Sequence, residues 1–84
     1  MKQILFDRHA RKRIKESGAG DMEVESVIRD PELLLPSVKD RMNAFRWLNG
    51  RYLRVTFKEE TDAILVITVA VRKRPFVGDN RHEN

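Results

Sequence analysis

Asn49-Gly50 lies between two runs of alternating apolar and polar residues and restricts the fold of this chain more than any other feature. A two-residue turn of type I′ needs a positive φ at both central positions, and asparagine followed by glycine tolerates this best. The sequence therefore predicts a β-hairpin formed by residues 42–48 and 51–58. In its second strand, three apolar side chains would share the face toward a core: Leu53, Val55 and Phe57.

The spacing of apolar residues changes at Pro31, from helical steps before it to strand-like runs after it. Asp7 is predicted to cap a first helix over residues 8–16, because its carboxylate can accept backbone N–H groups that lack helical partners. Asp21 is predicted to cap a second helix. This helix ends before Pro31, because the residue preceding a proline disfavours helical geometry.

Three further segments have the composition of strands. Residues 33–38 are apolar, and Pro36 restricts this strand to an edge of the sheet. Residues 63–71 are almost all apolar or β-branched, which suits a central strand. Residues 2–6 form either a short edge strand or the lead into the first helix. We therefore expect an α+β fold in which two N-terminal helices pack on an antiparallel sheet of three or four strands.

The chain has 84 residues, enough for one domain, which we expect over residues 1–75 with a loose tail over 76–84. There is no cysteine, and the longest apolar run is far shorter than the ~20 residues that span a bilayer. No signal peptide or membrane contact is expected, so the predicted location is the cytoplasm. His9 has basic neighbours and His82 lies in the tail, so the sequence predicts no metal site and no cofactor.

The net charge of +4 is distributed in blocks of alternating sign. Residues 1–17 carry six basic and two acidic groups, and residues 36–58 carry six and one. In a third basic block, Arg72, Lys73 and Arg74 are candidates for phosphate contacts, or else form a solubilising end of the domain. Three basic blocks that converge on one face would bind a polyanion such as RNA, DNA or an acidic protein. Spread over the surface, the same charges would only keep the domain soluble.

The first basic block contains the pattern His9-Ala10-Arg11-Lys12-Arg13. His9 and Arg13 are four residues apart and lie on one side of the predicted helix. A histidine beside cations suits RNA strand cleavage, which needs proton transfer at the 2′-hydroxyl and the leaving oxygen, and positive charge near the phosphate. Arg11 and Lys12 would contact the RNA. Alternatively, His9 is an ordinary helix residue half buried against the sheet.

The predicted hairpin supplies a second group of candidate residues. With a two-residue turn, Trp47 pairs with Tyr52 and Phe45 pairs with Arg54. Trp47, Tyr52 and Arg54 would then share a face able to stack bases and hold phosphates. Alternatively, the two aromatic rings form a cross-strand pair that covers the core. Arg46 would lie on the opposite, helix-covered face, where it must be paired or placed at the rim.

Four short motifs lie along the chain: His9-Ala10-x-x-Arg13, Val24-x-x-Val27-Ile28-x-Asp30-Pro31, Asn49-Gly50-Arg51-x-Leu53-x-Val55 and Val66-Ile67-Thr68-Val69. Together they resemble small bacterial and archaeal domains related to the BrnT toxins, over about residues 5–74. The resemblance implies a RelE-like fold, RNA-cutting residues in a cleft, and an antitoxin that blocks them. Carried over by position, His9, Arg13 and Arg46 would be the functional residues.

The sequence thus favours a metal-independent endoribonuclease of toxin–antitoxin type, with His9 as the proton-transfer group and Arg13, Arg46 and Arg54 around the phosphate. Its expected partners are RNA, including ribosome-bound mRNA, and a cognate antitoxin protein. A non-catalytic module of the same fold that binds nucleic acid or protein is the alternative. A third reading is a structural domain that forms a homodimer through the apolar edge strand at residues 33–38.

Overall fold

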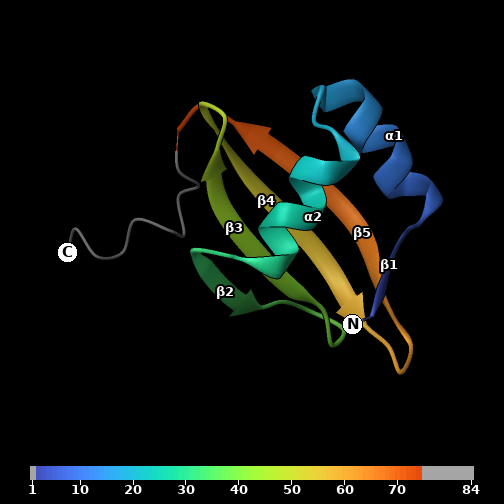
Figure 1. Cartoon of the computed structure of the whole chain (residues 1–84). Helices are drawn as coiled ribbons and strands as arrows, with labels where there is room; N and C mark the ends of the chain where they lie inside the picture. Colours follow the sequence, from blue (N-terminus) through green and yellow to red (C-terminus); the bar gives the residue numbers. More distant parts are fainter. Residues whose placement is uncertain (1, 75–84) are drawn as a thin grey trace.

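A computed structural model of the chain describes residues 2–74, in which two helices lie on one face of a five-stranded sheet (Figure 1). The elements in chain order are β1 (Gln3–Phe6), α1 (Arg8–Ser17), α2 (Asp21–Arg29), β2 (Leu33–Pro36), β3 (Met42–Leu48), β4 (Arg51–Glu59) and β5 (Ala63–Arg72). The predicted α+β class, with its helices near the N-terminus, is confirmed. The tail predicted over 76–84 lies outside the described residues.

Both helices begin at a capping residue, which was predicted correctly for α1 and one residue too late for α2. The carboxylate of Asp7 accepts a hydrogen bond from the Ala10 N–H at 2.8 Å, as predicted for the cap of α1. The cap of α2 is Gly20, one residue before the predicted Asp21. The reason is Glu23, whose carboxylate accepts the Gly20 N–H at 3.0 Å. Asp21 instead lies in the first turn, where its charge is favourable to the helix dipole.

The β3–β4 hairpin has the predicted register. Asn49 and Gly50 have φ angles of 54° and 80°, which satisfies the requirement for two positive values. Trp47 is paired with Tyr52 across the hairpin. Arg46 lies opposite a core leucine, whereas Arg54 is on the other face of the sheet. The pairing expected for a two-residue turn is therefore confirmed, and the apolar alternation of the second strand had already indicated which of its faces lies toward the core.

The prediction of a purely antiparallel sheet of three or four strands is wrong. The strand order is β1-β5-β4-β3-β2, and β1 is parallel to β5. The physical reason is that Ile4 and Phe6 alternate toward the core, where they pack beside the inward side chains of β5. The Asp7 N–H donates to the Val66 carbonyl at 3.1 Å, and the chain then turns into α1. As a result, β1 pairs with β5 only along residues 63–66.

The main core lies between the helices and the sheet. Its largest fully buried side chains come from α2, β4 and β5: Val24, Val27, Leu53, Val55 and Val66. A second, smaller cluster lies on the other face, where Phe45 and Tyr52 are buried with Leu33, Leu35 and Ala70 packed around them. The sheet is therefore apolar on both faces near its centre, as expected for a chain whose last strand is apolar throughout.

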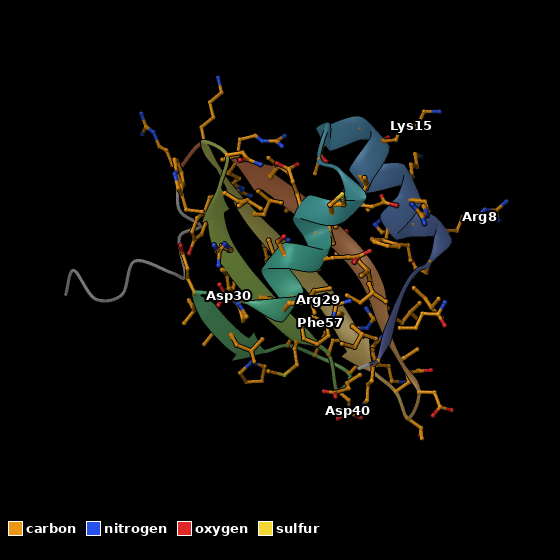
Figure 2. All side chains as sticks on the ribbon, viewed as in Figure 1. Arg8, Lys15, Arg29, Asp30, Asp40 and Phe57 are labelled. Atoms are coloured by element: carbon orange, nitrogen blue, oxygen red, sulfur yellow. The ribbon has the colours of Figure 1, made fainter. Side chains whose placement is uncertain are left out.

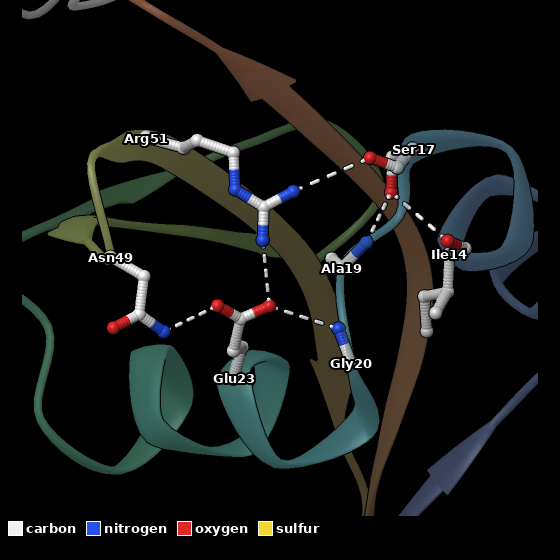
Figure 3. Close-up of polar contacts among 7 residues, drawn as sticks. All are labelled: Ile14, Ser17, Ala19, Gly20, Glu23, Asn49 and Arg51. Carbon is white, nitrogen blue, oxygen red and sulfur yellow. Dashed lines mark hydrogen bonds and ion pairs between the residues drawn. The ribbon is translucent and has the colours of Figure 1, made fainter.

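Glu23 joins the loop between the helices to the β3–β4 hairpin (Figure 3). Its carboxylate accepts hydrogen bonds from the Asn49 side chain at 2.5 Å, the Gly20 N–H at 3.0 Å and the Arg51 guanidinium at 2.8 Å. Arg51 also donates to the Ser17 carbonyl at 3.4 Å. The hydrogen bond from Asn49, followed by those from Gly20 and Arg51, holds the pKa of Glu23 below its usual range.

We predict that Glu23→Gln lowers the free energy of unfolding by about 1 kcal/mol near neutral pH. Because folding lowers the pKa of Glu23, its ionised form stabilises the folded chain above pH 4.5. This stabilisation is lost as pH falls through the folded-state pKa, so the variant and the wild type should converge in acid. Urea titrations at several pH values measure this difference.

The control for this experiment is Glu25→Gln on the same helix. Glu25 faces Arg29 at 3.8 Å in an i, i+4 pair, which contributes a few tenths of a kcal/mol. A Glu23→Gln deficit that stays constant down to acid pH would contradict the role given to the carboxylate charge.

Candidate functional site

A groove of about 410 Å³ lies at the edge of β5, and we call it the β5-edge groove. It is lined by residues of three elements: Arg13, Glu16 and Ser17 of α1, Arg54 of β4, and Thr68, Val69, Ala70, Val71 and Arg72 of β5. Successive side chains of a strand point to opposite faces of a sheet. A groove that touches five consecutive residues of β5 therefore runs along the edge of the strand.

This edge exists because β1 is short. Within the described residues 2–74, β5 has a strand partner on its outer side only at residues 63–66. Beyond Val66, α1 lies beside β5 in place of a strand (Figure 1). The groove occupies the space between this helix and the outer side of β5.

Three arginines meet at the β5-edge groove, and each comes from a different basic block of the sequence. Arg13 belongs to the first block, Arg54 to the second and Arg72 to the third. Glu16 is the one carboxylate among the lining residues, and it lies 3.9 Å from the Arg13 guanidinium. Both side chains of this pair are about half exposed. The lining residues therefore carry three basic groups and one acidic group, and the basic groups come from all three basic blocks.

His9 lies close to this groove without lining it. It is exposed on the first turn of α1, in a shallow hollow shared with Asp7, Arg8 and Lys12. His9 is four residues before Arg13, which corresponds to about 6 Å along the helix axis. The alternative in which His9 is half buried against the sheet is wrong. Figure 2 shows that Arg8, next to it, also points away from the domain.

Arg46 is separated from the other three predicted catalytic residues. It lies opposite Leu53 on the helix-covered face, whereas Arg54 is on the other face. Its guanidinium donates to the Asp30 carbonyl and carboxylate, both at 2.7 Å, at the end of α2. The sequence-based expectation that Arg46 is paired or at the rim of this face is thus met. The β5-edge groove does not include it.

The aromatic residues of the hairpin combine both sequence-based alternatives. Tyr52 is buried, with the ring centroids of Phe45 and Trp47 each 6.3 Å from its own. Trp47 is 45% exposed. In the strand register, Trp47, Tyr52 and Arg72 form one row across β3, β4 and β5. An exposed indole therefore lies two strands, about 10 Å, from the end of the groove.

Of the other residues predicted to contact RNA, one is held by contacts within the domain and three are exposed. Arg11 stacks on the Phe6 ring at 4.4 Å and donates to the Asp21 carboxylate at 2.7 Å. Its guanidinium therefore supports the packing of α1. Lys12 is exposed beside the hollow of His9. Lys73 and Arg74 are exposed and directly follow Arg72 at the end of β5.

The sequence-based site missed Glu16 and Thr68, which both line the groove. A signal for Glu16 was present, because the first basic block has only one other acid, Asp7, whose carboxylate caps α1. No local signal marks Thr68, since its position depends on where β1 ends. Within residues 2–74, no group of three histidine or acidic side chains is arranged to hold a metal ion.

No protein-family model, curated protein or solved structure matches the chain. Among the described residues, no helix is both long and apolar enough to cross a membrane. The properties of the site must therefore be inferred from its own residues.

We predict that Arg11→Ala lowers the free energy of unfolding by about 0.5–1 kcal/mol, because it removes the contacts to Phe6 and Asp21. The neighbouring Lys12→Ala should change stability by less than half of this amount. Thermal or urea unfolding of the two variants measures the difference. Equal stability of both variants would contradict the structural role of Arg11.

Proposed function

We propose that this protein binds single-stranded RNA at the β5-edge groove and cleaves it without a metal ion, as a toxin-type endoribonuclease with a RelE- or BrnT-like fold. The observation that carries the proposal is the meeting of Arg13, Arg54 and Arg72 beside Glu16. The two helices on one face of a twisted sheet support the proposed fold relationship. Ribosome-bound mRNA and a blocking antitoxin protein are the corresponding partners.

The groove suits the RNA backbone because its cations come from both sides of the β5 edge. A guanidinium can bind two phosphate oxygens at once, which fixes orientation as well as charge. Trp47 lies on the same face as Arg54 and Arg72. A phosphate held at Arg72 would leave a neighbouring base within reach of this exposed indole for stacking.

Cleavage would proceed by attack of the 2′-oxygen on the adjacent phosphorus. In the proposed reaction, the Glu16 carboxylate accepts the 2′-hydroxyl proton, the 2′-oxygen–phosphorus bond forms and the bond to the 5′-oxygen breaks. His9, two helical turns before Glu16 on the same side of α1, delivers a proton to the leaving 5′-oxygen. Arg13 and Arg54 stabilise the charge that develops on the phosphoryl oxygens. The products are a 2′,3′-cyclic phosphate end and a 5′-hydroxyl end.

A second candidate function is RNA binding without cleavage. It is favoured by the position of His9, which lies in a separate hollow outside the groove. In this alternative the arginines hold the backbone, and no group is placed to move a proton to the leaving oxygen.

We predict that RNA binding weakens steeply with salt, because each neutralised phosphate releases counterions. Arg54→Ala and Arg72→Ala should each reduce the slope of log affinity against log salt by about 0.7, the contribution of one contact to single-stranded RNA. Fluorescence anisotropy with a labelled oligouridylate measures this slope.

The control for RNA binding is Lys15→Ala. Lys15 is an exposed cation of the same helix that points away from the domain (Figure 2) and does not line the groove. If the slope falls equally for Lys15→Ala and for the two arginine variants, binding is a general property of the basic surface and the groove proposal fails.

We predict that the wild-type protein leaves cyclic phosphate ends on RNA in the presence of EDTA, and that its expression arrests growth. His9→Ala and Glu16→Gln should each slow cleavage by about 10²–10⁴-fold, because each removes one proton transfer. The double variant should lose less than the product of the two effects, since groups that act in one step are not additive.

Unfolding and RNA affinity of each variant are measured in parallel. A folded His9→Ala protein that binds RNA normally and cuts at the wild-type rate would contradict the assignment. If the wild type cuts no RNA with or without ribosomes, the binding function replaces the catalytic one.

A further inference from the structure

We propose that two copies of this chain associate side by side through β2, with the two strands antiparallel about a two-fold axis near Leu35. The contact surface is formed by residues 33–38, which we call the β2 edge. The proposal goes beyond RNA binding, because β3 and β4 separate β2 from β5 and no residue of the β2 edge lines the β5-edge groove.

The β2 edge is an apolar margin of the sheet. Within residues 2–74, no strand lies beyond β2. Residues 33–38 carry no charged side chain, and alternate residues are exposed: Leu34, Pro36 and Val38. The exposed fractions of Leu34 and Val38 are 47% and 69%. Natural sheets commonly protect an edge with charged side chains, so an edge of this composition indicates a surface that binds another chain.

A second β2 strand would bury apolar side chains on both faces of the sheet. On the face away from the helices, Leu33 and Leu35 pack against the smaller core cluster and remain partly exposed. The same two leucines of a second copy would extend this cluster. On the other face, Leu34 is paired with Ala44 of the main core, but α2 lies over β3 and β4 (Figure 1). The partner strand would therefore cover Leu34 where the helix does not.

The charges at the two ends of β2 identify a second copy as the occupant. Glu32 precedes the strand and Lys39 follows the β2 edge, and both are exposed. Lys39 belongs to no ion pair within the described part of the chain. In an antiparallel pair, the start of each strand lies beside the end of the other. With Leu35 opposite the partner's Leu35, Glu32 lies next to the partner's Lys39, and symmetry makes this contact twice.

The edge strand on the other side of the sheet, β1, differs in charge and provides the control. Lys2, at the start of β1, forms an ion pair with Glu59 at 2.8 Å. The exposed apolar side chain of β1 is Leu5, with an exposed fraction of 42%. Leu5 therefore matches Leu34 in residue type, exposure and position on an edge strand, but lies outside the proposed contact.

The contact should be weak and depend on protein concentration. Pro36 has no backbone N–H, so it reduces the number of hydrogen bonds that two β2 strands can exchange. Two short strands also form a small contact beside the ~800 Å² per partner of a standard interface. Apolar side chains would therefore contribute most of the affinity.

The first test is sedimentation equilibrium of the full chain at increasing concentration. We expect the wild type to dimerise and Leu34→Lys to raise the Kd at least about tenfold, because it places two like charges near the two-fold axis. Leu5→Lys should leave the Kd unchanged. An equal loss of dimer in both variants, or a wild type that stays monomeric throughout, would overturn the proposal.

The second test uses the absence of cysteine from the chain. Directly opposite residues of an antiparallel pair have Cα atoms about 4.5–5.5 Å apart, which suits a disulfide. Under mild oxidation, Leu35→Cys should form a cross-linked dimer at least about tenfold faster than Leu5→Cys. Equal rates would mean random collision and contradict the proposed contact. Neither test depends on RNA, because no substituted residue lines the β5-edge groove.

Discussion

The register between β3 and β4 is the constraint on which the rest of the structure depends. Leu53 and Val55 are fully buried under the helices, and they alternate with Arg54 on the same strand. A slip of one residue would expose this pair and drive the arginine into the core, so apolar burial also fixes the face on which the cation lies. The positive φ angles of Asn49 and Gly50 select the same register from the turn. The face on which Arg54 lies is thus set by the burial of its two neighbours on the strand.

The second constraint is the length of β1. Its last residue, Phe6, is followed at once by the cap of α1, so the helix takes over the outer side of β5 where the strand ends. Accessible strand edges expose unpaired backbone groups and invite aggregation, and natural sheets protect them with charge or with a covering element. Here α1 lies alongside the edge, and Arg13 and Arg72 flank it. The edge is thus flanked by positive charge, which is one of the ways in which natural sheets protect an edge.

Features that depend on neighbouring residues could be predicted from the sequence, whereas features that join distant segments could not. The cap at Asp7 and the turn at Asn49-Gly50 depend on neighbouring residues, and both were predicted correctly. The pairing of β1 with β5 joins segments about sixty residues apart. No local pattern gives its direction, and the groove is a consequence of it. The expected hairpin register already placed Arg46 and Arg54 on opposite faces of the sheet. It did not indicate that Arg46 pairs with Asp30. The sequence therefore shows the three basic blocks but not which of their arginines lie at the same groove.

Residues 18–35 form an acidic block, which explains why some of the arginines lie at the β5-edge groove and others do not. Most of its acids lie on or next to α2, on the helix side of the sheet, and three of them bind arginines that lie outside the groove. These pairs are Asp21 with Arg11, Glu23 with Arg51, and Asp30 with Arg46. Because the two charges of an ion pair offset one another at long range, these three arginines add little net charge to the surface. Arg13, Arg54 and Arg72 instead line the β5-edge groove, where the carboxylate among the lining residues is that of Glu16. The fold thus places the acids of this block mainly on the helix side of the sheet, where they pair with arginines of other elements, and it brings one arginine from each basic block to the β5-edge groove.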